Sequence, residues 1–136
     1  MIKQIVNFAV FFSLLMPVCA AAKVQVAVIA PKSGDYRDLG SELIEGAVAA
    51  VEEINASGGL KGKKLEVRAI DDACSENLAV STAQMLSVSA ENKPQLVVGP
   101  YCSEGFDKVA DIYSKAQIFQ IVPTALSYRF EADDSH

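Results

Sequence analysis

The chain has 136 residues, of which 51% are hydrophobic and 7% aromatic, and its 12 basic and 17 acidic side chains give a formal net charge of −5. This hydrophobic content excludes an intrinsically disordered chain, and the length suits one domain. Nucleic acid is excluded as a partner, because phosphate neutralisation needs concentrated positive charge. The single histidine, His136, is the last residue, which excludes a metal site built from several histidines.

The first 22 residues have the three parts of a secretory signal peptide. Lys3 provides a positive start, Ile5–Val18 is an almost unbroken apolar run, and alanines occupy positions 20 to 22. The apolar run is shorter than the roughly 20 residues that a membrane span needs. We therefore expect an exported protein that is cleaved after Ala20 or Ala22. A buried N-terminal helix is the alternative.

Two cysteines lie beyond the expected cleavage site. Cys19 belongs to the signal segment, so the mature chain would keep Cys74 and Cys102. An even pair of cysteines in an oxidising compartment is usually bonded. Two buried free thiols are the alternative.

Seven elements are predicted after residue 22, alternating between strand and helix periodicity. Val24–Ala30 is a continuous apolar run apart from one glutamine, which is typical of a strand buried on both faces. Apolar residues then recur at helical spacing from about residue 41 to residue 56, and Gly58-Gly59 ends this helix. Two more helices are predicted, at about residues 75–90 and around residues 106–113, with further strands at Leu65–Asp71, Gln95–Gly99 and Ile118–Val122.

This order of elements predicts an α/β fold with a doubly wound parallel sheet and helices on both faces. Ligands of such sheets bind beyond the carboxyl ends of the strands. The segments expected there are rich in Ser, Gly, Thr, Pro and Tyr, which suits binding by backbone amides and hydroxyls. Ser103 lies where the third helix opens, so free N–H groups and the helix dipole there suit a carboxylate; a plain helix N-cap is the alternative role.

Three further motifs are weaker. Gly58–Lys63 is interpreted as a turn, because it follows a helix and lacks the spacing of a phosphate loop. Asp71-Asp72 is interpreted as a strand-end turn and N-cap rather than a metal-binding or catalytic pair. The acidic residues near His136 are interpreted as a solvated tail. Without an internal histidine no His-based triad can form, and we expect no enzyme, no cofactor and no metal.

Together these segments resemble the N-terminal part of periplasmic Leu/Ile/Val-binding proteins, the solute-binding components of ABC importers for branched-chain amino acids. The resemblance rests on VAVIAPKSGDYRDLG, INASGGLKGKKLEV, DDACSEN, VVGPYCSEG and QIVPTALS, and covers essentially all of residues 23–127. It implies two α/β lobes of the type I solute-binding fold, a periplasmic location, and a disulfide between Cys74 and Cys102. It also implies an amino acid as ligand and the membrane subunits of an ABC importer as partners.

The resemblance assigns ligand-binding roles to individual positions. Ser103 matches the serine that holds the ligand's α-carboxylate, and Thr124 falls where a backbone carbonyl holds the α-ammonium group. Tyr101 is expected to line the pocket.

Other positions depart from the family pattern. Leu126 stands where the family has a threonine, so its hydroxyl is missing unless Ser127 takes that role. Leu39 stands where the family often has a pocket aromatic, for which Tyr36 is the expected substitute. These differences bear on the ligand's identity rather than on the class of protein.

The family's chains are much longer than 136 residues. We therefore expect a signal peptide (1–22), a partial N-terminal lobe (23–127) and a terminal tail (128–136). In the usual strand order 2-1-3-4-5, the fourth strand would pair with a missing fifth. Half a cleft is expected to bind amino acids very weakly or not at all. A truncated, non-functional remnant and a flavodoxin-like enzyme are the alternatives, the latter disfavoured by the absent catalytic set.

Overall fold

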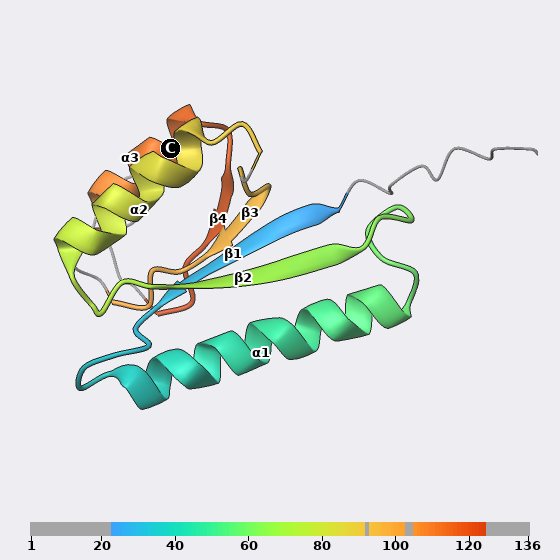
Figure 1. The fold of residues 1–136 in the computed structure, drawn as a ribbon, viewed down its shortest axis with the longest axis horizontal. Helices are drawn as coiled ribbons and strands as arrows, with labels where there is room; N and C mark the ends of the chain where they lie inside the picture. Colours follow the sequence, from blue (N-terminus) through green and yellow to red (C-terminus); the bar gives the residue numbers. More distant parts are fainter. Residues whose placement is uncertain (1–22, 92, 103–104, 125–136) are drawn as a thin grey trace, which may run out of the picture.

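The computed structural model describes residues 23–91, 93–102 and 105–124, and the predicted signal peptide and terminal tail lie outside these residues. Seven elements follow one another along the chain (Figure 1). Their bounds are β1 (Val24–Ala30), α1 (Arg37–Ala56), β2 (Leu65–Asp71), α2 (Glu76–Val88), β3 (Leu96–Val98), α3 (Phe106–Lys115) and β4 (Phe119–Ile121). None of the helices in the described residues is long and apolar enough to span a membrane.

The four strands form one parallel sheet in the order β2-β1-β3-β4. Val26 of β1 lies opposite Val67 of β2 on one side and Leu96 of β3 on the other. β1 is therefore an inner strand, and its last five residues are buried. β4 is an edge of the described sheet, with Phe119 69% exposed. The prediction of a parallel sheet in this order is confirmed.

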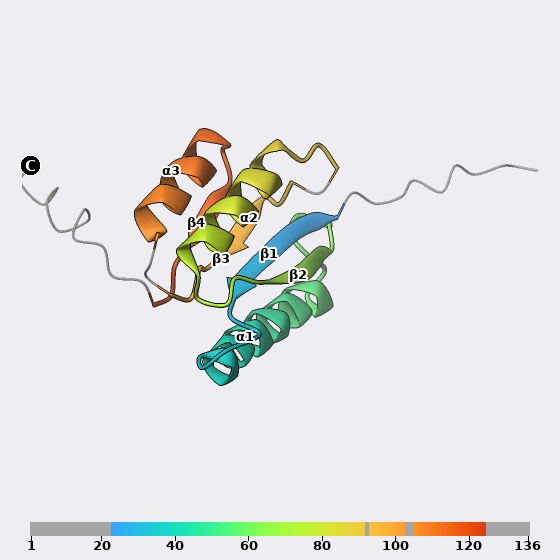
Figure 2. The same cartoon turned by 60° about the vertical axis from the view of Figure 1, so that its left-hand side comes forward.

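Helices cover both faces of the sheet, as the doubly wound fold requires. α1 lies along one face, and α2 and α3 lie side by side over the other (Figures 1 and 2). Because side chains alternate along a strand, Ala27 and Ile29 of β1 point toward α2 and α3, whereas Val26 and Val28 point toward α1. The main core lies on the α2–α3 side and contains Ala27, Ile29, Ala79, Ala83, Leu86, Val97, Val109, Tyr113 and Ile118.

α1 begins at Arg37, earlier than the predicted start near residue 41. Its first turn packs against the start of the preceding loop, and a Cβ at Gly40 would lie 1.9 Å from the carbonyl oxygen of Pro31. At the other end, the N–H of Gly59 donates to the carbonyl of Ile54 at 2.8 Å, and Gly58 and Gly59 have φ angles of 103° and 80°. Left-handed glycines that satisfy the last carbonyls are a common helix end, so the predicted turn is confirmed.

The remaining elements agree with the predicted ranges except at their ends. β3 and β4 are each two residues shorter than predicted, and α2 ends at Val88 instead of near residue 90. α3 begins at Phe106, with Gly105 (φ 76°) as its N-cap residue. Gly105 thus occupies the N-cap position that was the alternative role for Ser103.

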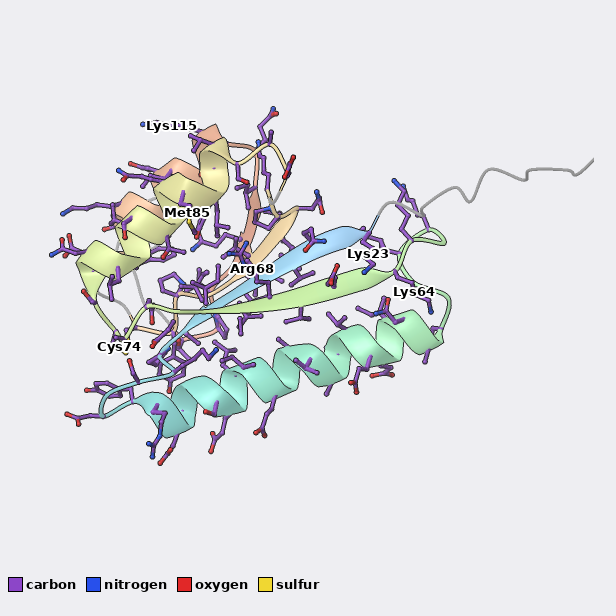
Figure 3. The ribbon with its side chains drawn as sticks, viewed as in Figure 1. Lys23, Lys64, Arg68, Cys74, Met85 and Lys115 are labelled. Atoms are coloured by element: carbon purple, nitrogen blue, oxygen red, sulfur yellow. A yellow bond between two sulfur atoms is a disulfide. The ribbon has the colours of Figure 1, made fainter. Side chains whose placement is uncertain are left out.

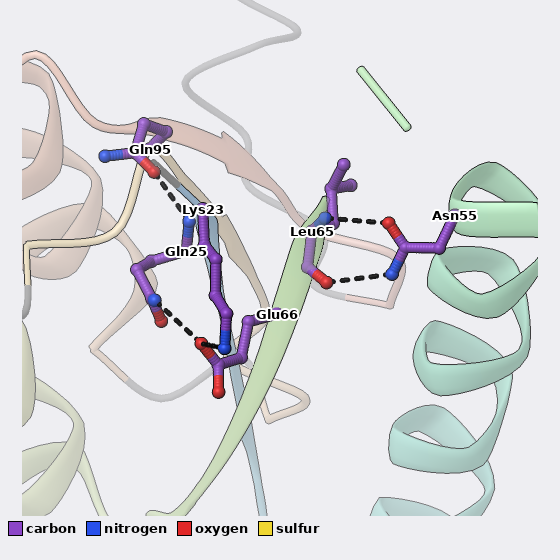
Figure 4. A network of polar contacts seen from close by, with 6 residues as sticks. All are labelled: Lys23, Gln25, Asn55, Leu65, Glu66 and Gln95. Atoms are coloured by element: carbon purple, nitrogen blue, oxygen red, sulfur yellow. Dashed lines mark hydrogen bonds and ion pairs between the residues drawn. The ribbon is translucent and has the colours of Figure 1, made fainter. Parts of the chain in front are cut away.

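A polar network fixes the amino end of the sheet (Figure 4). The side chain of Asn55 donates to the carbonyl of Leu65 at 2.9 Å and accepts from its N–H at 2.8 Å, which joins the end of α1 to the start of β2. Glu66 accepts from Gln25 at 3.1 Å and pairs with Lys23 at 3.2 Å. Figure 3 shows Lys23 and Lys64 at this end and Cys74 at the opposite end of β2.

Candidate ligand site at the carboxyl ends of the strands

The loops that follow the four strands all lie at one edge of the sheet, because the strands are parallel. They are residues 31–36 after β1, 72–75 after β2, 99–105 after β3 (of which 103 and 104 lie outside the described residues) and 122–124 after β4. Three links join these loops to one another. We call the linked loops the carboxyl-edge brace.

The first link is the carboxylate of Asp71, which joins the loops after β1 and β2. Its Oδ1 accepts from the backbone N–H of Lys32 and of Ala73, each at 2.8 Å, and its Oδ2 accepts from Ser33 Oγ at 2.8 Å. The N–H of Lys32, followed by the Ser33 hydroxyl and the Ala73 N–H, holds the pKa of this carboxyl below its usual value, although partial desolvation opposes the effect.

The second link is a disulfide between Cys74 and Cys102, whose Cα atoms are 5.4 Å apart. It joins the loops after β2 and β3, which lie on either side of β1 in the sheet. Ala73 and Cys74 both have positive φ angles, so the chain turns sharply between β2 and the disulfide. The pairing of these two cysteines agrees with the sequence analysis.

The third link joins the loops after β3 and β4. Thr124 Oγ1 donates to the carbonyl of Tyr101, and the N–H of Gly99 donates to the carbonyl of Ile121 at 2.8 Å. Gly99 also lies so close to β1 that a Cβ would be 2.2 Å from the carbonyl oxygen of Ile29. The φ angle of Gly99 is 111°, which other residues rarely adopt. The close approach and this φ angle together require glycine.

Two polar side chains near the brace are buried, those of Asp72 and Tyr113. Asp72 is 1% exposed, and burial raises the pKa of its carboxyl, although it accepts from the N–H of Cys74 at 3.2 Å. The hydroxyl of Tyr113 has no hydrogen-bond partner among the described residues, and burial, together with the nearby Asp72, raises its pKa.

The two aspartates form a turn, as the sequence predicts, but not a helix cap. The N–H of Ser75 donates to the backbone carbonyl of Asp72 at 2.7 Å, and Ser75, rather than an aspartate, is the N-cap residue of α2. In the part of the chain that the structure describes, no three His, Cys, Asp or Glu residues are grouped so that they could hold a metal ion.

The predicted ligand residues are only partly described. Tyr101 is half-buried and Thr124 is exposed, and their hydrogen bond brings them together. Tyr36 and Leu39 lie at the start of α1, beside the loop after β1, and are 53% and 42% exposed. Ser103, Leu126 and Ser127 lie outside the described residues, so their roles remain predictions.

Sequence reasoning did not find the role of Asp71 in the brace. Its partners Lys32 and Ser33 are 39 and 38 positions away along the chain, so no local pattern connects them. The sequence feature that could have indicated this role is an aspartate at the last position of a predicted strand that neighbours the inner strand of the sheet.

Comparisons with known proteins identify the class of this chain. The family model for periplasmic binding proteins matches residues 23–135, and the chain therefore belongs to the periplasmic binding protein family. This agrees with the resemblance found in the sequence and with the observed fold.

Among individual relatives, the chain is similar to the Leu/Ile/Val-binding protein of Escherichia coli, with 36% identity over 105 residues that cover 77% of this chain and 28% of the relative. An amino acid binding protein of Pseudomonas aeruginosa is 34% identical over 121 residues, covering 89% of this chain and 32% of that protein. The chain thus spans about a third or less of the length of these curated relatives.

Solved structures give the same result. The substrate-binding protein LivJ from Streptococcus pneumoniae, in complex with isoleucine, superimposes with a TM-score of 0.70 at 30% identity, covering 78% of this chain and 30% of LivJ. An ABC transporter substrate-binding protein from Desulfitobacterium hafniense, in complex with Leu, superimposes with a TM-score of 0.66 at 26% identity, covering 83% of this chain and 32% of that protein. These relatives are described as binding proteins for transport rather than as enzymes.

Proposed function

We propose that this chain forms part of an amino-acid-binding protein that captures a branched-chain amino acid and delivers it to an ABC importer. The observation that carries this proposal is the similarity to Leu/Ile/Val-binding proteins across a lobe whose ligand-side loops are linked in a brace. Capture here is reversible and involves no covalent chemistry.

The proposed contacts with the ligand follow from the brace. The start of α3 and Ser103 would hold the α-carboxylate, because free N–H groups at a helix N-terminus favour a negative charge. The backbone carbonyl of Thr124 would accept from the α-ammonium group. The Thr124 hydroxyl already donates to the carbonyl of Tyr101. This supports a role for the backbone carbonyl of Thr124, rather than for its side chain, in binding the ligand.

The apolar part of the ligand would lie near the remaining predicted residues. Tyr101 on one side and Tyr36 with Leu39 on the other would line the pocket, and Leu126 or Ser127 would complete it. The exposure of Tyr36 and Leu39 leaves apolar surface at this edge that a ligand side chain could cover.

A titration followed by NMR tests this function. Leucine, isoleucine and valine are added at millimolar concentration to ¹⁵N-labelled protein, and we expect shifts at the amides of Tyr101, Gly105 and Thr124. Leucinamide, which lacks the carboxylate, is the matched control and should cause little change. The amide of Leu65, at the other end of the sheet, should not respond. Equal shifts with leucine and leucinamide, or shifts confined to amides away from this edge of the sheet, would contradict the proposal.

We also propose that a signal peptide within residues 1–22 directs export to the periplasm and is then cleaved off after Ala20 or Ala22. The periplasmic binding protein family supports this location. Intact-mass measurement of the protein from a periplasmic extract should show a chain that begins at Ala21 or Lys23. A chain that keeps Met1 in that fraction would contradict it.

A further inference from the structure

The loop after β1 leads to Tyr36, which is proposed to line the pocket, and a carboxylate of the neighbouring strand binds this loop. Asp71 receives the N–H of Lys32 and the hydroxyl of Ser33 from this loop, each at 2.8 Å. The same carboxylate oxygen that binds Lys32 also accepts from Ala73, one residue before Cys74. Asp71 thus accepts hydrogen bonds both from the loop after β1 and from the loop after β2.

The remaining links of the brace extend this connection to the other half of the pocket. From Ala73 the chain continues directly into the disulfide with Cys102, next to Tyr101, which accepts from Thr124. A continuous set of contacts therefore runs from the loop that leads to Tyr36 as far as Thr124.

We propose that Asp71 is a positioning residue of the amino-acid site, which sets the loop after β1 relative to the loops that the disulfide joins. This inference rests on the proposed function. Asp71 acts as a hydrogen-bond acceptor and does not touch the ligand. Its role then depends on the two oxygen positions rather than on the negative charge.

Two substitutions of Asp71 separate a role as hydrogen-bond acceptor from a role that depends on its negative charge. Asp71→Asn keeps an Oδ1 atom that can accept from Lys32 and Ala73, and its amide can donate to the Ser33 hydroxyl. Asp71→Ala removes all three bonds. If Asp71 instead bound the ligand's ammonium group through its charge, the two variants would lose binding equally.

Glu66→Ala is the matched control. Glu66 is a second exposed carboxylate of β2 that accepts hydrogen bonds, and contacts with Gln25 and Lys23 lower its pKa as well. It lies next to Lys23 and Gln25 at the amino end of β2 (Figure 4), whereas the brace lies at the carboxyl end. Its removal therefore deletes the same chemical group without touching the loops.

Two readouts on the full chain test the inference. Hydrogen exchange, followed by NMR, should be about tenfold faster at the amides of Lys32 and Ala73 in Asp71→Ala, since each loses its hydrogen-bond acceptor. Asp71→Asn and Glu66→Ala should leave these two rates close to those of the wild type. In the leucine titration, Asp71→Ala should weaken binding several-fold, with Asp71→Asn retaining most of it.

Each contrary outcome has a definite meaning. Unchanged exchange in Asp71→Ala overturns the positioning role, and so does a loss of leucine binding in Asp71→Asn as large as in Asp71→Ala. If the wild type responds equally to leucine and leucinamide, the proposed function fails, and the exchange rates alone decide whether Asp71 positions the loop. Circular dichroism melting curves show whether the variants are folded. If Asp71→Ala does not fold, the comparison of Asp71→Asn with the wild type still tests the inference.

Discussion

Two adjacent aspartates at the carboxyl end of β2 have opposite electrostatic environments. Asp71 is exposed and accepts three hydrogen bonds, which lower its pKa, whereas Asp72 is buried and burial raises its pKa. Their contributions to stability therefore depend on pH with opposite signs. The contribution of Asp71 is present above its unfolded pKa near 3.8 and is lost as pH falls through its lower folded value.

Replacing Asp72 by Asn should raise the free energy of unfolding at neutral pH by about 1 kcal/mol. The raised folded pKa means that ionised Asp72 costs stability as pH rises above 3.8, and Asn keeps the Oδ1 that accepts from Cys74. Urea denaturation at several pH values measures this, and the gain should vanish below pH 3.8. A gain that persists undiminished in acid would show that ionisation is not its source.

Replacing Tyr113 by Phe should leave the protein as stable or stabilise it by about 1 kcal/mol. The buried hydroxyl has no hydrogen-bond partner among the described residues, so its removal relieves a desolvation cost and keeps the ring in the core. Urea denaturation of the two proteins is the measurement. A loss of more than about 1 kcal/mol would indicate that the hydroxyl is bonded in solution.

At this scale the sequence predicted a turn at the aspartate pair, and the structure has one. The opposite surroundings of the two side chains could not be predicted. They depend on the loop after β1 for Asp71 and on the layer that contains Tyr113 for Asp72, both of which are distant in the sequence.

At the scale of single elements, the two glycines of α1 have different roles. Gly40 lies in the first turn, where a Cβ would be 1.9 Å from the carbonyl oxygen of Pro31, whereas a Cβ at Gly46 would meet no atom within 4 Å. The same substitution at these two positions therefore separates helix propensity from packing.

Gly46→Ala should stabilise the protein by about 0.5–1 kcal/mol, because alanine is the better helix former. Gly40→Ala should destabilise it by about 1–3 kcal/mol or more, since the first turn must move away from Pro31. Thermal and urea denaturation of both variants measure the difference. Equal effects of the two substitutions would mean that the first turn is free to shift.

The same glycine explains why the start of α1 was predicted too late. Residues 37–40 carry no apolar periodicity, and Gly40 in this turn lies against Pro31, the first residue after β1. By contrast, β1 and β2 have the predicted bounds, because a continuous apolar run and a strand-like segment before a turn are local patterns.

For the whole molecule, the disulfide should be the largest single contribution to stability within the brace. It connects positions 28 residues apart. Closing a loop of that length corresponds to about 3–4 kcal/mol in the chain-entropy model. The double variant Cys74→Ser/Cys102→Ser should lose about this free energy of unfolding. A reducing agent should destabilise the wild type but not the variant, and equal responses to reduction would contradict the prediction.

The overall architecture could be predicted from the sequence because alternating periodicities specify it, and the strand order is the usual one for such doubly wound sheets. The candidate site could be predicted only in part. Strand ends indicated which loops meet, and the cysteine pair agreed with one link, but the Asp71 and Thr124 links depend on tertiary contacts. The roles of Ser103, Leu126 and Ser127 stay predictions.

The inner position of β1 has a consequence for the order of folding. The strand comes first in the chain, yet its neighbours come much later: Gln25 contacts Glu66, 41 positions on, and Gln95, 70 positions on. Pairing over such separations slows folding, because loop closure precedes the favourable contacts. During synthesis, the most buried of the described strands must therefore wait for residues 96–98 before both of its edges are paired.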